Sequence, residues 1–398
     1  MSDSPDVLSL REGRFARFEA VSWWRQERLR SARVLVIGAG ALGNEVLKNL
    51  ALLGVGQVAV ADQDHVELSN LSRSVLYRET DEGKPKAECA ARAMESIHAG
   101  TQITPLVGNV LADLGLGWFR WADVVVGALD NREARVFVNS ACARTGRPWV
   151  DGGIEVLQGI VRGFFPPQTA CYECTMSQVD WDLIQKRRSC TMLARRALAE
   201  RGTPTTPTTA SVIGGMQAQE VIKLLHGMEA LTGRGFFFDG AYHQSYAMNY
   251  PVHPDCPWHE PAAEIMTMEA WGGSTPLREI AAEAERRLGG LDALDLSREL
   301  VEAMECAPCG TQTAVWRAAE HVSEEQLVCP ACGGACAPRL VHSLPGGSPL
   351  LERTVSGLGL PVWDILYARH GEQVLGFELA ADSPFATNSL SPSSPVNP

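Results

Sequence analysis

Three cysteines and a group of cations share one short stretch of the sequence, residues 171–196, which reads CYECTMSQVDWDLIQKRRSCTMLARR. Cys171 and Cys174 form a C-x-x-C pair, which suits a metal site, a redox disulfide or two core positions. Cys190 stands alone among lysines and arginines. Neighbouring cations favour the thiolate, which is the nucleophilic form, so Cys190 is a candidate for covalent catalysis. An idle thiol on a basic loop is the alternative.

A second set of cysteines has the spacing C-x2-C-x19-C-x2-C and comprises Cys306, Cys309, Cys329 and Cys332. This spacing is typical of a zinc ribbon, in which each of two tight turns supplies two thiolates. Cys336 is a spare candidate ligand. We expect the zinc to be structural and the lobe around it to bind a partner. Cys89 and Cys142 fall in helical patterns and are expected in the core.

A nucleotide site is indicated by GAGALG, in which Gly38, Gly40 and Gly43 form G-x-G-x-x-G between an apolar run and a helical pattern. Bare backbone at such a turn lets phosphates approach the N-terminus of the helix. Asp62 ends the next apolar run, about where an acidic residue would hydrogen-bond the ribose. These features alone fit an NAD-dependent dehydrogenase equally well.

Further charges lie in the segments ADQDHVELSNLSRSVLY, GKPKA and ALDNREAR, which contain Arg73, Lys86 and Asp130. Hydride transfer does not need this set. Adenylation does, because a carboxylate must attack an anionic α-phosphate and expel pyrophosphate. With these motifs in this order, residues 10–260 resemble the ThiF/MoeB superfamily of adenylating enzymes, to which the ubiquitin-activating enzymes belong.

The resemblance implies a role toward MgATP for each motif. Asp62 would bind the ribose, and Asp130, with Asn131 nearby, would hold Mg²⁺. The implied phosphate contacts are Asn70, Arg73 and Lys86.

The N-terminal segment REGRFARFEAVSWWRQERL resembles the helix from which, in this family, an arginine enters the ATP site of the partner subunit. Arg17 matches that arginine best and Arg14 is the second choice. Phe18 stands where the family usually has a polar residue, so a solvated helix face is the alternative. We therefore expect a homodimer with Arg17 acting in trans.

The resemblance also suggests partners for Cys171 and Cys174. In related activating enzymes, a C-x-x-C pair directly before a long crossover loop binds zinc together with a second pair late in the adenylation domain. This chain has Cys256 and His259 at that place, and His253 is the other candidate for the fourth ligand.

The elements that must position these residues follow from the hydrophobic periodicity. Strand-like runs occur at 34–37, 58–62 and 123–128. Helical patterns occur at 41–53, from near 130, and at 211–226. The alternation predicts an α/β fold with a doubly wound, mostly parallel, Rossmann-like sheet.

A change of pattern near residue 262 divides the chain. We expect an adenylation domain at 1–262, with a crossover loop at 176–209. A smaller C-terminal domain at 263–382 would contain two amphipathic helical stretches at about 276–304 and the zinc ribbon at 306–332. Residues 383–398, rich in Ser, Pro and Asn, are expected to form a disordered tail.

The composition excludes some classes of partner. A net charge of -12 argues against binding nucleic acid, and no apolar segment in the 398 residues is long enough to span a membrane. No secretion signal is recognised, so we expect a cytoplasmic protein. In a reducing compartment, eleven cysteines with these spacings favour metal sites and catalysis over disulfides.

These observations predict ATP-dependent activation of a ubiquitin-like protein. Its C-terminal carboxylate would be adenylated with MgATP and then captured as a thioester on Cys190, because CTM resembles the surroundings of the catalytic cysteine in some activating enzymes. A conjugating enzyme would then accept it. The alternative is a sulfur-carrier adenylyltransferase of the thiamin or molybdopterin type. A non-catalytic nucleotide-gated scaffold is disfavoured by the complete set of Arg73, Lys86 and Asp130.

Overall fold

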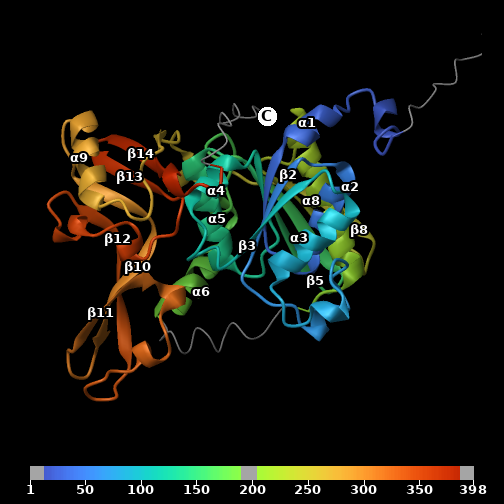
Figure 1. Cartoon of the computed structure of the whole chain (residues 1–398). Coiled ribbons are helices and arrows are strands. Elements are labelled where there is room, and N and C mark those ends of the chain that lie inside the picture. Colours follow the sequence, from blue (N-terminus) through green and yellow to red (C-terminus); the bar gives the residue numbers. More distant parts are fainter. Residues whose placement is uncertain (1–12, 190–203, 386–398) are drawn as a thin grey trace, which may run out of the picture.

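The first domain is built on a sheet of eight strands in the order β3-β2-β1-β4-β5-β6-β7-β8. Figure 1 shows this domain beside the second one, which is drawn in orange and red. The computed structural model describes residues 13–189 and 204–385. The strands are β1 (Arg33–Ile37), β2 (Gln57–Asp62), β3 (Gln102–Val107), β4 (Val124–Gly127), β5 (Trp149–Glu155), β6 (Gln158–Phe164), β7 (Arg234–Asp239) and β8 (Gln244–Asn249). The neighbours from β3 to β5 pair in parallel, and those from β5 to β8 pair antiparallel. The predicted parallel arrangement is therefore confirmed for one half of a mixed sheet.

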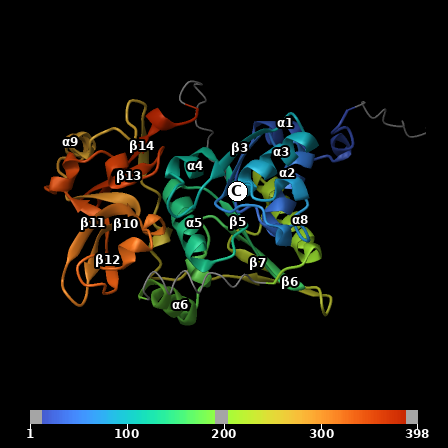
Figure 2. The same ribbon diagram turned by 60° about the horizontal axis from the view of Figure 1, so that its bottom comes forward.

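Helices cover both faces of this sheet (Figure 2). They are α1 (Gln26–Ser31), α2 (Ala41–Leu53), α3 (Lys86–Ile97), α4 (Leu116–Trp121), α5 (Arg132–Thr145), α6 (Gln178–Ser189) and α8 (Pro207–His226). One core cluster contains side chains of α2, α3 and α8, and the other contains those of α4 and α5. Strand β1 is buried along its whole length because it carries Val34 and Val36 to the first cluster and Leu35 and Ile37 to the second.

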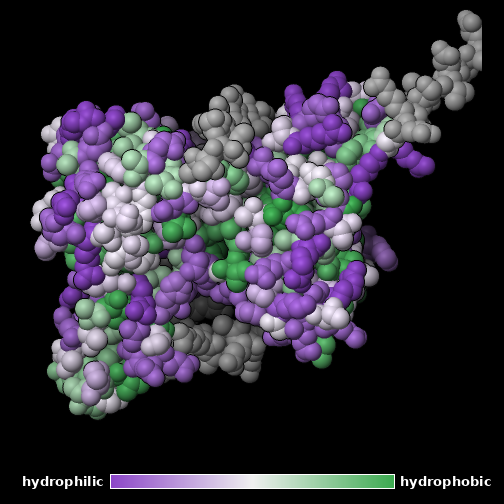
Figure 3. Space-filling model, in the orientation of Figure 1, coloured by the Kyte–Doolittle hydropathy of each residue, from purple (hydrophilic) through white to green (hydrophobic). Residues whose placement is uncertain are grey.

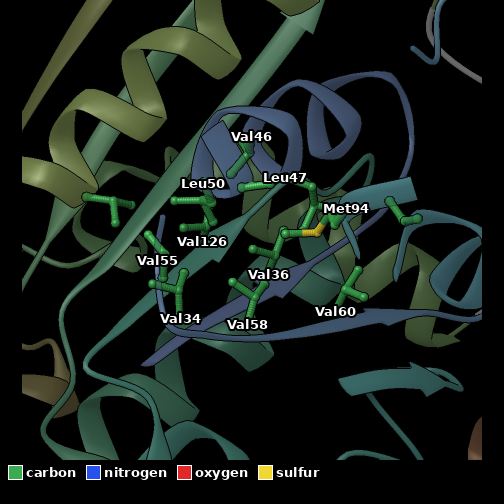
Figure 4. Close-up of a cluster of buried hydrophobic side chains, with 14 of the residues drawn as sticks. Val34, Val36, Val46, Leu47, Leu50, Val55, Val58, Val60, Met94 and Val126 are labelled. Atoms are coloured by element: carbon green, nitrogen blue, oxygen red, sulfur yellow. The ribbon is translucent and has the colours of Figure 1, made fainter. Parts of the chain in front are cut away.

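The first core cluster is made mainly of branched aliphatic side chains (Figure 4). Val36 of β1 and Val58 and Val60 of β2 face Val46 and Leu47 of α2. Such side chains favour strands and pack closely under a helix. The cluster thereby fixes α2, and with it the glycine turn at the N-terminus of this helix.

The second domain has a six-stranded sheet in the order β11-β10-β13-β14-β9, with β12 also paired to β10. Its elements are β9 (Glu264–Met268), α9 (Leu277–Leu288), β10 (Ala293–Cys306), β11 (Gln312–Ala318), β12 (Cys336–Pro345), β13 (Ile365–His370) and β14 (Gln373–Leu379). The prediction of two helices in 276–304 is wrong for the second, which is strand β10. Register shifts in its pairing with β12 break the alternation of apolar residues, which therefore imitates helical spacing.

Two further boundaries differ from those expected. Helix α8 begins at Pro207 rather than near residue 211, because the Thr206 side chain accepts a hydrogen bond from Thr209 N and proline suits the first helical position. The folded part also extends past residue 382, since the Phe385 ring stacks on Trp121. The remainder of the predicted tail lies outside the described residues.

The two domains meet along α4 and α5, and this contact contains buried polar groups (Figure 2). The buried Arg298 of β10 donates hydrogen bonds to the carbonyl oxygens of Leu111 (3.0 Å) and Leu114 (2.7 Å) in the first domain. The Asp364 carboxylate accepts hydrogen bonds from Leu116 N (3.0 Å) and from Ser297 Oγ (2.6 Å). Buried donors and acceptors are expensive to leave unpaired, so these bonds fix how the domains fit.

Within the two described segments, no helix has both the length and the apolarity that a membrane span requires.

Replacing Arg298 should destabilise the protein, because this residue connects the two domains. We expect Arg298→Met to lower the free energy of unfolding by about 2–4 kcal/mol, because two buried carbonyl groups lose a charged donor. Arg278→Met is the matched control, since Arg278 pairs with Glu352 at an exposed site and should cost less than about 1 kcal/mol. Scanning calorimetry measures both, and equal effects would contradict a stabilising role for this contact.

Candidate adenylation site and metal centres

A cleft of about 1290 Å³ opens at the carboxyl ends of the parallel strands. Figure 3 shows this face of the molecule hollowed between the two domains. Ligands bind at this edge in doubly wound sheets because loops and helix N-termini converge there. Seven of the predicted site residues line the cleft: Gly38, Gly40, Asp62, Arg73, Lys86, Asp130 and Asn131.

The glycine turn is close-packed, which explains two of its three glycines. Gly38 has φ +99°, and a Cβ there would lie 2.3 Å from Ala128 O. A Cβ on Gly43 would lie 2.0 Å from Gly38 O, so Gly43 lets α2 pack against the turn without lining the cleft. A Cβ on Gly40 would meet nothing within 4 Å, and its backbone is open to the cleft. Gly38 and Gly40 thus place bare backbone in the wall of the cleft at the N-terminus of α2, where phosphates can approach closely.

Asp62 ends β2 with its carboxylate fixed by the backbone. It accepts hydrogen bonds from Ala39 N (2.6 Å) and Asp64 N (2.8 Å). Burial raises the pKa of Asp62, and these hydrogen bonds and the Lys86 charge oppose that rise. The Lys86 ammonium in turn lies 2.9 Å from the Asp64 carboxylate. Asp64, two residues beyond Asp62, was not among the site residues predicted from the sequence.

Asp130 and Asn131 lie between β4 and the N-terminus of α5. Asn131 caps this helix by accepting a hydrogen bond from Ala134 N (2.8 Å), and its amide donates to Asp130 Oδ1 (3.0 Å). The Asp130 carboxylate is exposed to the cleft, as a ligand of a nucleotide-bound Mg²⁺ would need to be.

An ion-pair group that was not predicted from the sequence lies at the wall of the cleft. The fully buried Asp151 carboxylate accepts from Arg135 Nε (2.9 Å) and from Arg162 Nε (3.0 Å). Burial is the largest influence and lowers the pKa of Arg162, but the charge and hydrogen bond of Asp151, together with the nearby Tyr172 and Tyr250, raise it by more, so the net shift is upward. Both arginines line the cleft. The signal available in the sequence was a carboxylate inside an apolar strand, PWVDGG.

Besides Gly43, two predicted site residues within the described part of the chain, Asn70 and Arg17, do not line this cleft. Asn70 is buried and its side chain accepts from Glu67 N (3.1 Å), which caps a short 3-10 helix. Arg17 is exposed near the N-terminal end of the described chain and does not line the cleft of its own subunit. Cys190 lies outside the described residues. The described part of the crossover segment, helix α6, does reach the cleft through Asp180, whose carboxylate lies 2.9 Å from Arg132 Nε of α5.

Cys171, Cys174, Cys256 and His259 converge on one point. The Sγ atoms of Cys171 and Cys256 are 3.5 Å apart, and Cys174 Sγ is 3.1 Å from His259 Nε2. A tetrahedral zinc site with Zn–S bonds of about 2.3 Å has edges of about 3.8 Å, so the donors fit this metal. The His253 side chain is not in the group, which decides between the two candidate histidines in favour of His259.

The second group comprises Cys306, Cys309, Cys329 and Cys332. Sγ–Sγ distances are 3.4 Å between Cys306 and Cys332 and 3.6 Å between Cys309 and Cys329. Cys336 is buried beside this group, opposite Cys306 in the β10–β12 pairing, and is not a member of it. Four thiolates at these distances suit zinc. Cys89 and Cys142 are buried, as predicted.

Comparison with known proteins agrees with this geometry. The model of the ThiF family matches residues 13–258. The SAMP-activating enzyme E1 of Haloferax volcanii is 34% identical over 240 residues, which are 58% of this chain and 82% of that protein. The sulfur carrier protein adenylyltransferase of Thermus thermophilus is 32% identical over 257 residues, 62% of this chain and 90% of that protein.

Other relatives match over less of their length. A ubiquitin-activating enzyme E1-like protein of Saccharomyces cerevisiae is 34% identical over 154 residues, so this chain spans 24% of it. Among solved structures, Escherichia coli MccB with ATP has a TM-score of 0.53 at 22% identity, covering 64% of this chain and 75% of that one. This likeness shows the fold.

We predict that zinc binds once at each cysteine group. Elemental analysis of the purified chain should give a zinc content that falls by half in Cys256→Ser and by half in Cys332→Ser, because each variant removes one ligand from a different group. Cys142→Ser is the control and should keep the full content, since Cys142 is buried away from both groups. A content unchanged by Cys256→Ser would contradict the first site.

We also predict that Asp151 stabilises the domain. Asp151→Asn should lower the free energy of unfolding by about 3–5 kcal/mol, because two buried guanidinium groups lose the carboxylate charge that they share. In the control Glu302→Gln, which removes the more exposed pair with Arg339, the loss should stay below about 1 kcal/mol. Chemical denaturation followed by tryptophan fluorescence measures the stability of both variants, because the buried Trp149 on the same strand as Asp151 reports unfolding.

Proposed function

Since this chain belongs to the ThiF family, we propose that it is an adenylyltransferase that activates the C-terminal carboxylate of a ubiquitin-like protein with MgATP. The observation that carries the proposal is the convergence of Arg73, Lys86 and Asp130 on one cleft beside the glycine turn and Asp62. A nucleotide-binding fold explains the turn and Asp62 alone. The additional cations and carboxylate are those that transfer of an adenylyl group requires.

In the first step, a carboxylate oxygen of the carrier attacks the α-phosphorus of ATP. The bond to the bridging oxygen of the β-phosphate breaks, and pyrophosphate leaves. Lys86 and Arg73 offset the charge on the phosphates, and Asp62 orients the ribose. Mg²⁺ at Asp130 would neutralise charge on the departing pyrophosphate.

In the second step, the Cys190 thiolate attacks the carbonyl carbon of the acyl adenylate. A thioester forms, AMP leaves, and the acyl group is ready for a conjugating enzyme. The cations around Cys190 in the sequence support this role because they favour the thiolate. Helix α6 lines the cleft through Asp180 and ends at Ser189, and Cys190 is the next residue in the sequence.

A second candidate is adenylation of a sulfur-carrier protein, after which a sulfur donor rather than Cys190 would receive the acyl group. The relative from Thermus thermophilus, which matches over more of this chain than the two E1 relatives named above, favours it. The first step is the same in both candidates.

A homodimer remains part of the proposal. Arg17 is exposed and does not reach the cleft of its own chain, as expected for a residue that acts in the site of a second subunit.

The two steps should separate by mutation. With a ubiquitin-like protein ending in Gly-Gly as substrate, exchange of labelled pyrophosphate into ATP should fall by about 100-fold or more in Lys86→Ala and Asp130→Ala. Exchange should persist in Cys190→Ala, because this cysteine acts only on the finished acyl adenylate. Equal loss in all three variants would contradict the separation of steps.

The adduct with the carrier then decides between the two candidates. Thioester formation on Cys190 predicts an ATP-dependent band on a non-reducing gel that thiol reductant removes. Cys190→Ala should lack the band. Exchange without any such band in the unmodified chain would favour sulfur-carrier adenylation.

A further inference from the structure

A short piece of the second domain lies in the wall of the nucleotide cleft. The 3-10 helix η6 (Ala319–His321) follows β11, and its residues Ala319 and Glu320 line the cleft together with residues of the first domain. Among the described residues that line the cleft, these two alone come from the second domain. The wall is therefore formed only when the two domains are in contact.

Helix η6 contacts the loop that follows β3. His321 Nε2 lies 2.9 Å from the Asp113 carboxylate. Asp113 also accepts a hydrogen bond from Asn109 N (2.7 Å), and the Asn109 amide donates to Gln63 Oε1 (2.8 Å). A chain of polar contacts thus connects η6 to the residue next to Asp62.

The order of the strands shows which end of the cleft this is. The glycine turn follows β1, Asp62 ends β2, and the contacted loop follows β3, in the spatial order β1-β2-β3. If phosphates lie at the turn and ribose at Asp62, the base extends toward the loop after β3. Helix η6 therefore faces the base and ribose rather than the phosphates. The Glu320 carboxylate in this wall also disfavours phosphate there.

The position of η6 depends on the second cysteine group. The segment between Cys309 and Cys329 contains β11 and η6, so both of its ends are ligand positions. Val322, directly after η6, is fully buried in one cluster with Cys306 and Cys329, and Ala319 packs against this cluster. Holding these thiolates together thereby holds η6.

We propose that η6 is the base-side wall of the nucleotide cleft and that His321 is a positioning residue for nucleotide binding, with η6 kept in place by metal at Cys306, Cys309, Cys329 and Cys332. The inference rests on the proposed function, in which this cleft binds ATP. It gives the second domain a direct part in nucleotide affinity.

The test compares the dissociation constants of AMP and of a non-hydrolysable ATP analogue by calorimetry, without carrier protein. His321→Ala should weaken both ligands by the same factor, about 3- to 10-fold, because the base and ribose are common to them. His370→Ala is the matched control, since His370 contacts Asp292 (3.1 Å) at a similarly exposed site of the same domain and should leave both constants unchanged. Cys309→Ser should weaken AMP binding as His321→Ala does, together with the loss of one zinc ion.

The outcomes separate this inference from the proposed function. If the unmodified chain binds neither AMP nor the analogue, the proposed function fails and the inference with it. The unmodified chain could instead bind both ligands, with Lys86→Ala weakening the analogue more than AMP. If His321→Ala then changes neither dissociation constant, the proposed function stands and the role of η6 as a wall of the cleft is refuted. A loss in His321→Ala confined to the ATP analogue would place η6 at the phosphates and overturn the base-side assignment.

Discussion

The candidate site depends on one interaction, the ion pairing of the buried Asp151 carboxylate with Arg135 and Arg162. Asp151 lies on β5, the strand that pairs in parallel with β4 on one side and antiparallel with β6 on the other. Arg162 stands directly opposite it on β6, and Arg135 reaches it from α5 while also donating to Leu129 O and Gly152 O. A charge buried this deeply is tolerated only when it is paired and hydrogen-bonded. The pairing joins the two halves of the mixed sheet and fixes the N-terminal turn of α5, where Asp130 and Asn131 present their side chains to the cleft.

The sequence predicted the parallel half of the first domain well because its strands are buried on both faces. Continuous apolar runs such as RVLVI have few alternatives, and the helix from Ala41 to Leu53 has the bounds expected. Motif residues at strand ends were likewise brought together, since the carboxyl ends of parallel strands share one edge. Both metal-ligand groups were predicted from spacing and resemblance and converge in space.

Features that depend on tertiary contacts were not predictable. The Asp151 group joins residues 135, 151 and 162, and nothing local marks them as partners. Strand β10 was interpreted as a helix because its irregular pairing disturbs the alternation of its apolar residues. The role suggested for Asn70 rested on the family pattern and stays a prediction, and in the structure its side chain caps a short helix. The contact of η6 with the cleft could not be foreseen, because it follows from the packing of one domain on another.

Zinc bound at Cys171, Cys174, Cys256 and His259 would also restrict the unfolded chain wherever it stays bound there. The two halves of this group are 85 residues apart along the sequence. A cross-link that closes a ring of that length lowers the conformational entropy of the denatured ensemble. This loss corresponds to a free energy of roughly 4–5 kcal/mol at room temperature. The ring encloses α6, α8, β7 and β8. Strands β7 and β8 are the two outer antiparallel strands of the first sheet. Both strands come late in the first domain's sequence, and β8 lies at the edge of the sheet, so a zinc tether would make it entropically easier for them to find their partners.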